Sequence, residues 1–496
     1  MPEETASRSA ESPCWIVMGN RVYDVKPYLH DQPGGSAVLT RQDGPGGLHE
    51  TAESRRIHLS EILERLPVDA CLGTIDEAAR ASFLASIGST NPTGGGLAVN
   101  DPPHLSSIIV PNDFEAAAKV ILSAKQWTFI ASSAHDASAL RNNLASWKAI
   151  RLRPQIFRDV RTVDPRCRIL GAASPFPFFV SPMGRWGYEK PSGEISAYQA
   201  LARRGVHGVL SSESTASMED ITTAFDDEKR KVAAARKESA SGKLNEHRPE
   251  AQLHYQLYIP SDKAIAIQRI RRARSTGAFR SLWVTVDAPL LGKRSADRRL
   301  QAAEALGRSA EEAERAGFGF AAHAKSNEFN ASLTWDDVKW IKGEWGGPVV
   351  LKGVQTAEDA ARAANLGIDG VLLSNHGGRQ MHDAVDALTT LLEIRTYYPA
   401  LLDRLEIFVD GGCRDGADIL KAVALGARAV GVGRPFFYAF DAYGEKGIER
   451  CADIFVDELL TGMKLAGMRR ISEACPDHVN ASRLLNEIWR PEQDRS

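Results

Sequence analysis

The sequence predicts a (β/α)8 barrel, the TIM-barrel class of α/β fold, joined to a small N-terminal α+β module. Eight short apolar runs alternate with helix-length segments from about residue 175 onward, and eight is the number of strands that such a barrel needs. The chain has 496 residues, which suits a barrel with an added module better than one ordinary domain. Hydrophobic residues make up 43% of the chain, so there is ample material for a core.

The eight runs are apolar on both faces, which is typical of parallel strands buried between a barrel interior and surrounding helices. Segments between them, such as 357–366 and 417–425, carry helical periodicity, and this alternation indicates a parallel sheet. We assign residues 108–490 to the barrel unit. The predicted strands are 178–183, 208–214, 253–259, 281–287, 348–354, 370–376, 406–412 and 429–434.

Residues 12–78 are predicted to form the N-terminal module. Within it, the runs 15–17 and 22–25 flank a turn at Gly19-Asn20 and predict a β-hairpin. Residues 79–107 are predicted to be a linker, because their Gly and Pro clusters cannot continue a helix or a strand.

Two inserts interrupt the barrel pattern. Residues 226–250 are rich in Lys, Glu, Arg and Ser, and predict a solvated helix or loop. Residues 294–332 follow the fourth strand, and a connection of that length beside a catalytic face is often a lid. Surface elaboration without a role is the alternative for both.

Composition excludes several classes of partner. The formal net charge is -2, which gives no indication of a nucleic-acid or other polyanionic partner. The six cysteines form no CxxC pair, which argues against a disulfide framework or a zinc site and fits a reducing compartment. No apolar run is long enough to span a bilayer, and the N-terminus resembles no targeting signal. We expect a cytoplasmic protein with a small-molecule substrate and no membrane partner.

Polar residues gather where the predicted strands end. In this fold the carboxyl ends of the strands build the active site. Any one of these residues could be a helix cap or a satisfied core residue, but charges are rarely buried at one rim without a task. The residues are Gln256, Tyr258, Thr285, Asp287, Lys352, Ser374, His376, Arg379, Asp410, Arg414 and Arg434.

The residue types suggest how the chemistry is divided. His376 is the natural general base, because an imidazole pKa suits neutral pH. Asp287 could orient its ring and stabilise the imidazolium. Arg379 and Arg294 offer fork geometry for a carboxylate. Lys352 places a fixed positive charge beside a group that becomes anionic.

The last two strands suggest a phosphate site. Gly411, Gly412 and Gly433 let backbone amides approach a phosphate, and Arg414 and Arg434 can neutralise it. Late loops of barrels often hold a phosphate in this way.

Five motifs stand at the ends of the predicted strands: Thr-Val-Asp-Ala-Pro from 285, Leu-Lys-Gly-Val from 351, Ser-Asn-His-Gly-Gly-Arg-Gln from 374, Val-Asp-Gly-Gly-Cys-Arg from 409 and Gly-Arg-Pro-Phe from 433. Together they resemble the FMN-dependent 2-hydroxy acid dehydrogenases and oxidases, over about residues 108–490. The N-terminal module resembles the cytochrome b5-like haem domain, and in this order the chain is similar to a flavocytochrome L-lactate dehydrogenase.

The resemblance implies a role for each candidate residue. His376, paired with Asp287, removes a proton while the electrons of the substrate's C2 pass to the flavin, as a carbanion or as a hydride. Tyr258 hydrogen-bonds the substrate, and Arg379 and Arg294 hold its carboxylate. Relatives are often tetramers, so a homo-oligomer is expected.

The resemblance also implies FMN as the cofactor. Lys352 stabilises the reduced flavin. The other residues implied in flavin, ribityl or phosphate binding are Ser181, Pro182, Met183, Gly184, Ser211, Gln256, Thr285, Ser374, Asp410, Gly411, Gly412, Arg414, Gly433 and Arg434.

The haem motif departs from the family. Gln32 stands where the family has the first residue of His-Pro-Gly-Gly, and glutamine is a poor iron ligand compared with imidazole. His58 remains as a second candidate ligand to haem iron, whereas His30 is badly placed to replace Gln32. We expect that haem is lost, that the domain is degenerate, and that electrons pass from FMN to oxygen or another acceptor. A haem-containing flavocytochrome is the alternative.

Three departures lie near the expected substrate. Phe129 replaces a tyrosine whose hydroxyl touches the substrate carboxylate in the family, which removes a hydrogen bond worth about 1.5–3 kcal/mol. Glu213 stands where the family has a bulky apolar side chain, and either meets a cationic or hydroxyl-rich substrate or turns away toward an arginine. Gly184 is expected to open space beside the flavin. We therefore expect a substrate bulkier than lactate; a non-catalytic binding protein is the alternative from another class.

Overall fold

The computed structural model describes residues 101–186, 193–238, 250–305 and 329–491, together with three short N-terminal strands. The chain divides into two compact units, residues 1–98 and 99–496, which we describe separately. In the first unit, β1 (Trp15–Met18) pairs with β2 (Arg21–Asp24), and β2 pairs with β3 (Cys71–Thr74), in both cases antiparallel. The predicted hairpin is confirmed.

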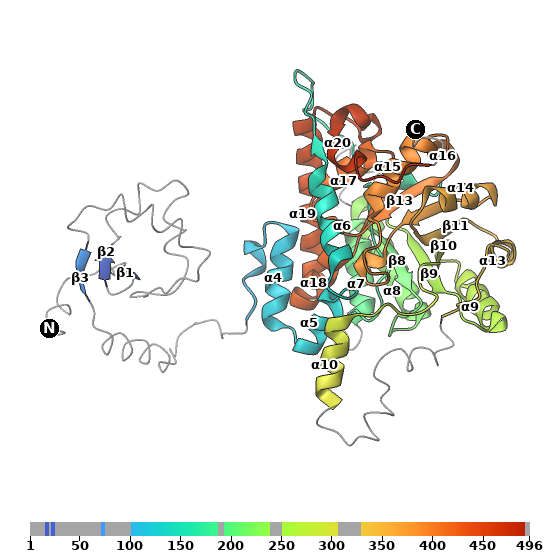
Figure 1. Ribbon diagram of the computed structural model, residues 1–496, viewed down its shortest axis with the longest axis horizontal. Helices are drawn as coiled ribbons and strands as arrows, with labels where there is room; N and C mark the ends of the chain where they lie inside the picture. The colour runs from blue at the N-terminus through green and yellow to red at the C-terminus, as the bar shows by residue number, and fades with distance from the viewer. Residues whose placement is uncertain are drawn as a thin grey trace. The chain divides into compact units, whose positions relative to one another are not determined.

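The second unit contains a closed barrel of eight parallel strands in sequence order, in which the last strand pairs with the first (Figure 1). Each of the eight predicted runs overlaps one of these strands, so the predicted fold is confirmed. The strands are β7 (Phe178–Val180), β8 (His207–Ser211), β9 (Leu253–Tyr258), β10 (Phe279–Thr285), β11 (Val349–Val354), β12 (Gly370–Leu373), β13 (Glu406–Asp410) and β14 (Ala429–Val432).

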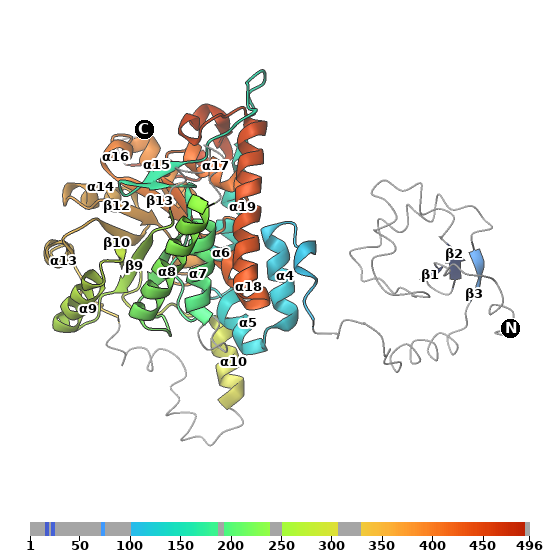
Figure 2. The same ribbon diagram turned by 180° about the vertical axis from the view of Figure 1, so that it is seen from behind.

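Helices connect successive strands and cover the outside of the barrel. The predicted helical segments 357–366 and 417–425 correspond to two of them, α14 and α17. Another, α19, packs against α7, α17 and α18 (Figure 2). The helices are α7 (Gly193–Arg204), α8 (Met218–Glu238), α9 (Lys263–Ser275), α13 (Asp337–Trp345), α14 (Ala357–Asn365), α15 (Ala387–Tyr397), α16 (Leu401–Arg404), α17 (Gly416–Ala424), α18 (Arg434–Tyr443), α19 (Glu445–Ala466) and α20 (Ser482–Leu485).

Elements outside the repeating pattern surround the barrel. Helices α4 (Pro111–Ile121), α5 (Ala124–Ala131) and α6 (Ser138–Ala149) precede the first barrel strand, and α4 packs against α18. Two small antiparallel pairs join β4 (Arg151–Leu152) to β15 (Val479–Asn480), and β5 (Cys167–Ile169) to β6 (Ala172–Ser174).

The two inserts are described in part. The start of the first insert is helical, since it lies in α8, and a helix is one of the two predicted forms. Residues 239–249 lie outside the described residues. Helix α10 (Ser295–Ala305) opens the second, and residues 306–328 lie outside as well. The lid role of this insert therefore stays a prediction. Gln32, His58 and most of the predicted linker also fall outside the described residues.

The barrel interior is filled with large apolar side chains. Phe179, Trp283 and Phe408 are buried there, with ring centroids 5.0–5.8 Å apart. Ile169 and Leu170, from the β5–β6 hairpin, belong to the same cluster. The barrel is thus a packed core that fixes the strand ends rigidly.

A polar chain crosses this core. His207 Nδ1 lies 3.3 Å from His254 Nε2, and His254 Nδ1 lies 2.6 Å from Ser281 Oγ. Burial lowers the pKa of His207 to about 3 and lowers the pKa of His254 well below its usual value. Both imidazoles are therefore neutral in the folded protein at neutral pH.

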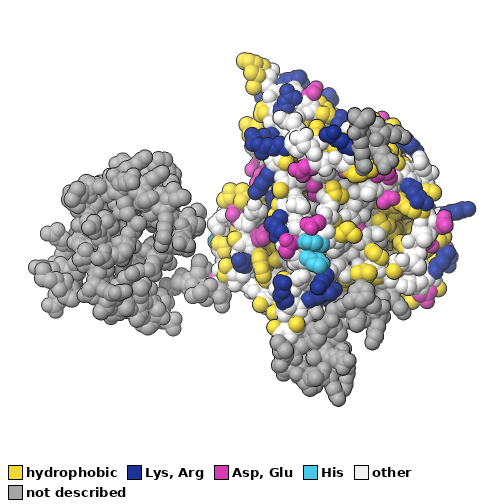
Figure 3. All heavy atoms as spheres, viewed as in Figure 1, with side chains coloured by type: hydrophobic (Ala, Val, Ile, Leu, Met, Phe, Trp, Pro, Cys, Tyr) yellow, Lys and Arg dark blue, Asp and Glu magenta, His cyan; other side chains and the backbone are white. Residues whose placement is uncertain are grey.

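The surface carries both signs of charge. Figure 3 shows Lys and Arg side chains interspersed with Asp and Glu over the viewed face of the barrel unit. None of the helices in the described part of the chain combines the length and apolar character that a bilayer crossing requires.

Candidate active site

Polar side chains follow the carboxyl ends of the barrel strands, as the sequence predicts. Tyr258 ends β9, Asp287 follows β10, Lys352 lies within β11 and His376 follows β12. The carboxyl ends of parallel strands meet at one rim of a barrel, so these side chains converge there.

His376 lies between Asp287 and Tyr258. Its Nδ1 is 3.1 Å and 3.2 Å from the two carboxylate oxygens of Asp287, and its Nε2 is 3.3 Å from the Tyr258 hydroxyl. A carboxylate only accepts, so the proton of a neutral ring is placed on Nδ1 and Nε2 presents a lone pair. The sequence-predicted His–Asp pair is therefore assembled, with Nε2 as the basic atom.

The local electrostatics favour this arrangement. Burial is the largest cause that lowers the pKa of His376, and the Lys352 ammonium lowers it further while Asp287 opposes. Burial alone raises the pKa of Asp287, but Lys352 and His376 outweigh it and the net pKa is lowered. Burial also raises the pKa of Tyr258 well above its usual value. At neutral pH the site holds a neutral imidazole, a carboxylate and a protonated phenol, which can act as base, anchor and donor.

The backbone of His376 is held in an unusual conformation. Its φ is +62°, in the left-handed region, where a residue other than glycine costs about 1–3 kcal/mol. The Ser374 hydroxyl accepts a hydrogen bond from His376 N at 3.0 Å and supports this turn. Ser374, predicted as a flavin ligand, thus also positions the base.

Lys352 is a buried cation. Its side chain is only 3% exposed, and its Nζ has no hydrogen-bond partner among the described residues. The next residue, Gly353, has φ +103°, and an added Cβ there would lie 2.5 Å from Asp287 Cγ. Close approach of Asp287 to this strand therefore requires glycine at 353. A buried ammonium without a partner is costly, which points to an electron-rich group that it meets in the complete site.

Two arginines lie on the loops that carry the base and its acid, Arg379 after β12 and Arg294 after β10. Arg379 Nη1 donates to the carbonyl oxygens of Phe129 at 2.8 Å and Ser132 at 2.9 Å. Burial is the main cause that lowers the pKa of Arg379, and the charge of Arg294 lowers it further. Neither forms an ion pair with a described residue, and Arg294 Nε is buried without a hydrogen-bond partner among these residues. Such a pair of cations suits an incoming carboxylate.

Phe129 contacts Arg379 with its ring as well as with its carbonyl. The guanidinium carbon lies 5.4 Å from the ring centroid, within the range of a cation–π contact. The end of helix α5 thus holds Arg379 through carbonyl groups and an aromatic face. The sequence did not predict this contact. It predicted only that Phe129 lacks a hydroxyl for the substrate carboxylate.

Arg434 reaches the same helix end. Its Nε donates to Ile130 O and its Nη2 to Ser132 O, both at 3.0 Å, so it meets the carbonyl end of the helix dipole. Burial lowers its pKa to about 10, and the charge of Arg414 contributes to this shift. Arg414 donates through Nη1 to Cys413 O at 3.1 Å. The role of these two arginines toward a phosphate stays a prediction.

A chain of side chains links three neighbouring strands. Ser211 Oγ donates to Gln256 Oε1 at 2.9 Å, and Gln256 Nε2 donates to Thr285 Oγ1 at 2.8 Å. All three side chains are at least nine-tenths buried. The sequence reading placed each of them on the flavin, and the structure brings them into one row at the ends of β8, β9 and β10.

Asp410 and Ser181 form a second buried pair across β13 and β7. Ser181 Oγ donates to Asp410 Oδ2 at 3.1 Å, whereas Asp410 Oδ1 is buried with no partner among the described residues. Ser181 begins the 181–184 segment, which contains Pro182 and Met183. A Cβ added at Gly433 would lie 3.5 Å from Met183 Sδ, so this segment borders the predicted phosphate loop.

Gly411 and Gly412 have φ values of +87° and +91°. Added Cβ atoms would lie 2.9 Å from Asn143 Nδ2 and 2.4 Å from Asn143 O, respectively, and Trp147 Nε1 donates to Gly411 O at 2.8 Å. Close packing of helix α6 therefore requires both glycines. Their role toward a phosphate stays a prediction.

One expectation is wrong. Gly184 was expected to open space beside the flavin, but a Cβ there would lie 2.7 Å from Glu213 O and 2.8 Å from Glu213 Cβ. The loop after β8 occupies that space. Glu194 fixes this loop, because its buried carboxylate accepts from the backbone amides of Thr215 at 2.6 Å and Ala216 at 2.9 Å. Glu213 N donates to Ser211 Oγ at 3.1 Å. Burial and the charge of Asp287 are larger causes of the raised pKa of Tyr258, to which the charge of Glu213 also contributes.

Sequence reasoning missed three contributors. Asn143 and Asn375 exchange two amide hydrogen bonds of 2.8 and 2.7 Å, and Gly378 N donates to Asn375 Oδ1 at 3.0 Å. The ring of Phe329 packs edge-on against Tyr258 at 5.2 Å. Asn375 stands inside the His376 motif, which is a signal for it, but nothing in the sequence distinguishes Asn143 or Phe329.

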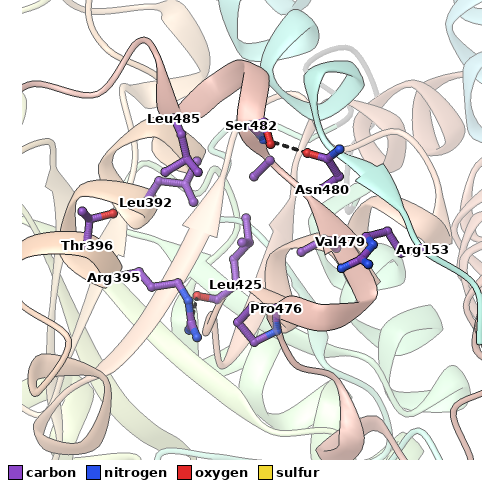
Figure 4. A pocket seen from close by; sticks show the side chains of 11 residues that line it. Arg153, Leu392, Arg395, Thr396, Leu425, Pro476, Val479, Asn480, Ser482 and Leu485 are labelled. Atoms are coloured by element: carbon purple, nitrogen blue, oxygen red, sulfur yellow. Dashed lines mark hydrogen bonds between the residues drawn. The ribbon is translucent and has the colours of Figure 1, made fainter.

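A separate hollow of about 630 Å³ lies where α15 and the end of α17 meet the C-terminal segment (Figure 4). Arg153, Arg395 and Leu485 are among the residues that line it. None of its lining residues belongs to the predicted site.

Comparison with known proteins agrees with this geometry. Residues 118–481 match the FMN-dependent dehydrogenase family. The chain belongs to this family. The predicted family, its enzyme class and its FMN cofactor are thereby confirmed. Residues 1–50 match the cytochrome b5-like heme/steroid binding domain, which confirms the predicted kind of N-terminal domain.

Individual relatives cover most of the chain. L-lactate dehydrogenase (cytochrome) of Saccharomyces cerevisiae is 32% identical over 97% of this chain and 80% of its own length. Human 2-hydroxyacid oxidase 2 is 33% identical over 76% of this chain and 100% of its own length. The flavin-binding domain of baker's yeast flavocytochrome b2 superimposes with a TM-score of 0.66 and 33% identity, over 79% of this chain and 91% of that chain.

This FMN-dependent dehydrogenase provides side chains that fit FMN. Lys352 Nζ, within β11, and Asp410 Oδ1, at the end of β13, are buried polar atoms without partners among the described residues. A donor and an acceptor in these places suit a ring carbonyl and a ribityl hydroxyl. Arg414 and Arg434 supply the positive charge that a phosphate requires.

Proposed function

We propose that this protein oxidises the CH–OH group of a 2-hydroxy acid to the 2-oxo acid, with His376 as the general base. The arrangement of Asp287, His376 and Tyr258 carries the proposal, because it leaves a basic Nε2 beside a protonated phenol at 3.3 Å. The names of the relatives, L-lactate dehydrogenase and 2-hydroxyacid oxidase, support the same class of substrate.

Each residue has a task that follows from its contacts. Arg379 and Arg294 bind the substrate carboxylate, and Tyr258 donates to the substrate oxygen. His376 Nε2 accepts a proton from the substrate's C2 carbinol group, and Asp287 stabilises the imidazolium that forms. When bound, FMN would accept the two electrons released at C2 together with the second of the two protons.

The cofactor residues have their own roles. Lys352 holds a positive charge beside the ring, where negative charge develops on reduction. Ser211, Gln256 and Thr285 would hold one edge of the ring, and Ser181, Asp410 and Ser374 would hold the ring or the ribityl chain. The segment with Pro182, Met183 and Gly184 would hold the ring as well, and the backbone of Gly411, Gly412 and Gly433 with Arg414 and Arg434 would hold the phosphate.

The substrate is a 2-hydroxy acid bulkier than lactate. Phe129 provides no hydroxyl to a carboxylate, so a small acid gains less binding energy from this side of the site. Phe329 adds an aromatic face beside Tyr258, where a larger side chain can pack. We also propose a cytoplasmic location and a homo-oligomer.

Anaerobic titration tests the proposal. The purified FMN-loaded chain is mixed with a panel of 2-hydroxy acids, and the flavin absorbance is followed. We expect a bulky 2-hydroxy acid to bleach the flavin of the wild type. We expect no such bleaching in H376A. Bleaching that persists unchanged in H376A would contradict the assignment of the base.

Haem binding is a second candidate function, favoured by the match of residues 1–50 to the cytochrome b5-like domain. Gln32 opposes it, because it replaces an imidazole ligand, whereas His58 remains available as the other ligand. We propose that stable haem is absent and that electrons pass to oxygen or another acceptor. A Soret band in the purified protein would overturn this and favour a flavocytochrome.

A further inference from the structure

Gln380 joins the two loops that carry the proposed catalytic residues. Its Nε2 donates to Asp287 O and to Leu290 O, both at 2.9 Å, and its Oε1 accepts from Gly292 N at 2.9 Å. The side chain is only 9% exposed. One buried amide therefore satisfies three backbone groups of the loop that follows β10.

The two loops also touch through their backbones. A Cβ added at Gly292 would lie 2.3 Å from Arg379 O and 2.5 Å from Gln380 O. Glycine is required there because the β10 loop passes directly over the loop that follows β12. The amide contacts of Gln380 thus close an interface with little room for movement.

Each loop supplies half of the site. The β10 loop carries Asp287 and leads to Arg294, whereas the β12 loop carries His376 and Arg379. The Asp287–His376 pair spans this interface, and each loop also carries one of the two arginines.

We propose that Gln380 is a positioning residue that sets the distance between Asp287 and His376 and between Arg294 and Arg379. Its side-chain amide contacts backbone groups of the β10 loop, and it acts through them. The inference rests on the proposed function, because the distances matter for proton transfer and for carboxylate binding.

The variant Q380M tests this inference, since methionine preserves the length of the side chain but can neither donate nor accept these hydrogen bonds. Release of the loop separates Asp287 from His376, and a small misplacement of reacting groups costs about 100-fold in rate. For a 2-hydroxy acid that reduces the flavin of the wild type, we expect kcat to fall about 100-fold in Q380M. We also expect the Kd for oxalate, measured from the change in flavin absorbance, to rise.

The pH dependence distinguishes positioning from general stability. Asp287 raises the pKa of His376, so its withdrawal moves the acid limb of kcat/KM to lower pH in Q380M. The matched control is E393M, which removes a buried side chain that accepts from Trp489 N at 3.0 Å, between α15 and the C-terminal segment. We expect E393M to lower Tm without moving the acid limb or the oxalate Kd.

A readout without substrate separates this inference from the proposed function. Carbethoxylation of His376 by diethyl pyrocarbonate, followed by peptide mass spectrometry across pH, reports the pKa of the base in the FMN-loaded full chain. A lower pKa in Q380M than in wild type and E393M supports the positioning role, even if no 2-hydroxy acid bleaches the flavin. The same His376 pKa in Q380M as in wild type overturns it, whatever the substrate proves to be.

Discussion

Asp287 faces His376 with both of its carboxylate oxygens, at 3.1 Å and 3.2 Å from Nδ1. The contact fixes the tautomer of the ring, because an acceptor on this side keeps the proton on Nδ1. It also offsets part of the effect of burial and of Lys352 on the pKa of His376. The loop after β10 thus controls both the orientation and the basicity of a residue on the loop after β12.

Replacement of Asp287 by asparagine should change the tautomer and the basicity of His376 while it preserves the shape of the site. The amide of D287N can donate to Nδ1, which stabilises the tautomer with the proton on Nε2 and removes the base. We expect the rate of flavin reduction to fall about 10⁴-fold, with FMN still bound. Stopped-flow reduction of the FMN-loaded variant measures this. A loss of less than tenfold would show that Asp287 does not select the tautomer.

Phe129→Tyr should restore a hydroxyl beside the arginine pair. The Phe129 ring already lies 5.4 Å from the Arg379 guanidinium, so the new group adds a donor near an incoming carboxylate. A hydrogen bond to a charged group is worth about 1.5–3 kcal/mol, so KM for small acids such as lactate should fall about tenfold or more. Steady-state kinetics with lactate and with a bulky acid checks this prediction.

The matched control F129L removes the ring and adds no hydroxyl. It should weaken binding of all 2-hydroxy acids, because Arg379 loses an aromatic face. An unchanged KM for lactate in F129Y would mean that the para position points away from the carboxylate.

The barrel could be predicted from the sequence because its strands, such as Val349–Val354, are buried on both faces and stand out as apolar runs. The base and its acid could be predicted because polar residues directly after such strands converge at one rim. Local sequence sufficed for these features, since each depends on a strand and the residue that follows it.

Contacts between distant segments could not be predicted. Asn143 and Asn375 are 232 positions apart, and neither residue type indicates its partner. The misjudged space at Gly184 has the same cause, because the path of the loop around Glu213 depends on the buried Glu194 carboxylate. One sequence reveals which residues lie at strand ends, but not which backbone fills the space between them.

Glu213 should influence the choice of substrate through its charge. This charge reaches the site, where it contributes to the raised pKa of Tyr258 after burial. We expect E213Q and E213L to improve kcat/KM for an aliphatic 2-hydroxy acid relative to one of equal length with a terminal ammonium group. The ratio of the two kcat/KM values is the measurement. An identical ratio in wild type and both variants would show that the Glu213 side chain is turned away from the substrate.

The neutral histidines within the barrel should make the fold sensitive to acid. Burial lowers the pKa of His207 to about 3, whereas an unfolded histidine titrates near 6.5. Between these values the unfolded chain binds more protons, so stability is complete above about pH 6.5 and falls as the pH is lowered toward 3. At about pH 4.5 the loss of folding free energy from His207 alone is on the order of 2–3 kcal/mol.

The variant H207N tests this. It removes the titration of His207, while its amide can still approach His254. The Tm of H207N should therefore fall less between pH 7 and about pH 4.5 than that of the wild type. The control H135N alters an exposed histidine and should follow the wild type. Parallel curves for H207N and the wild type would mean that His207 does not take up a proton on acid unfolding.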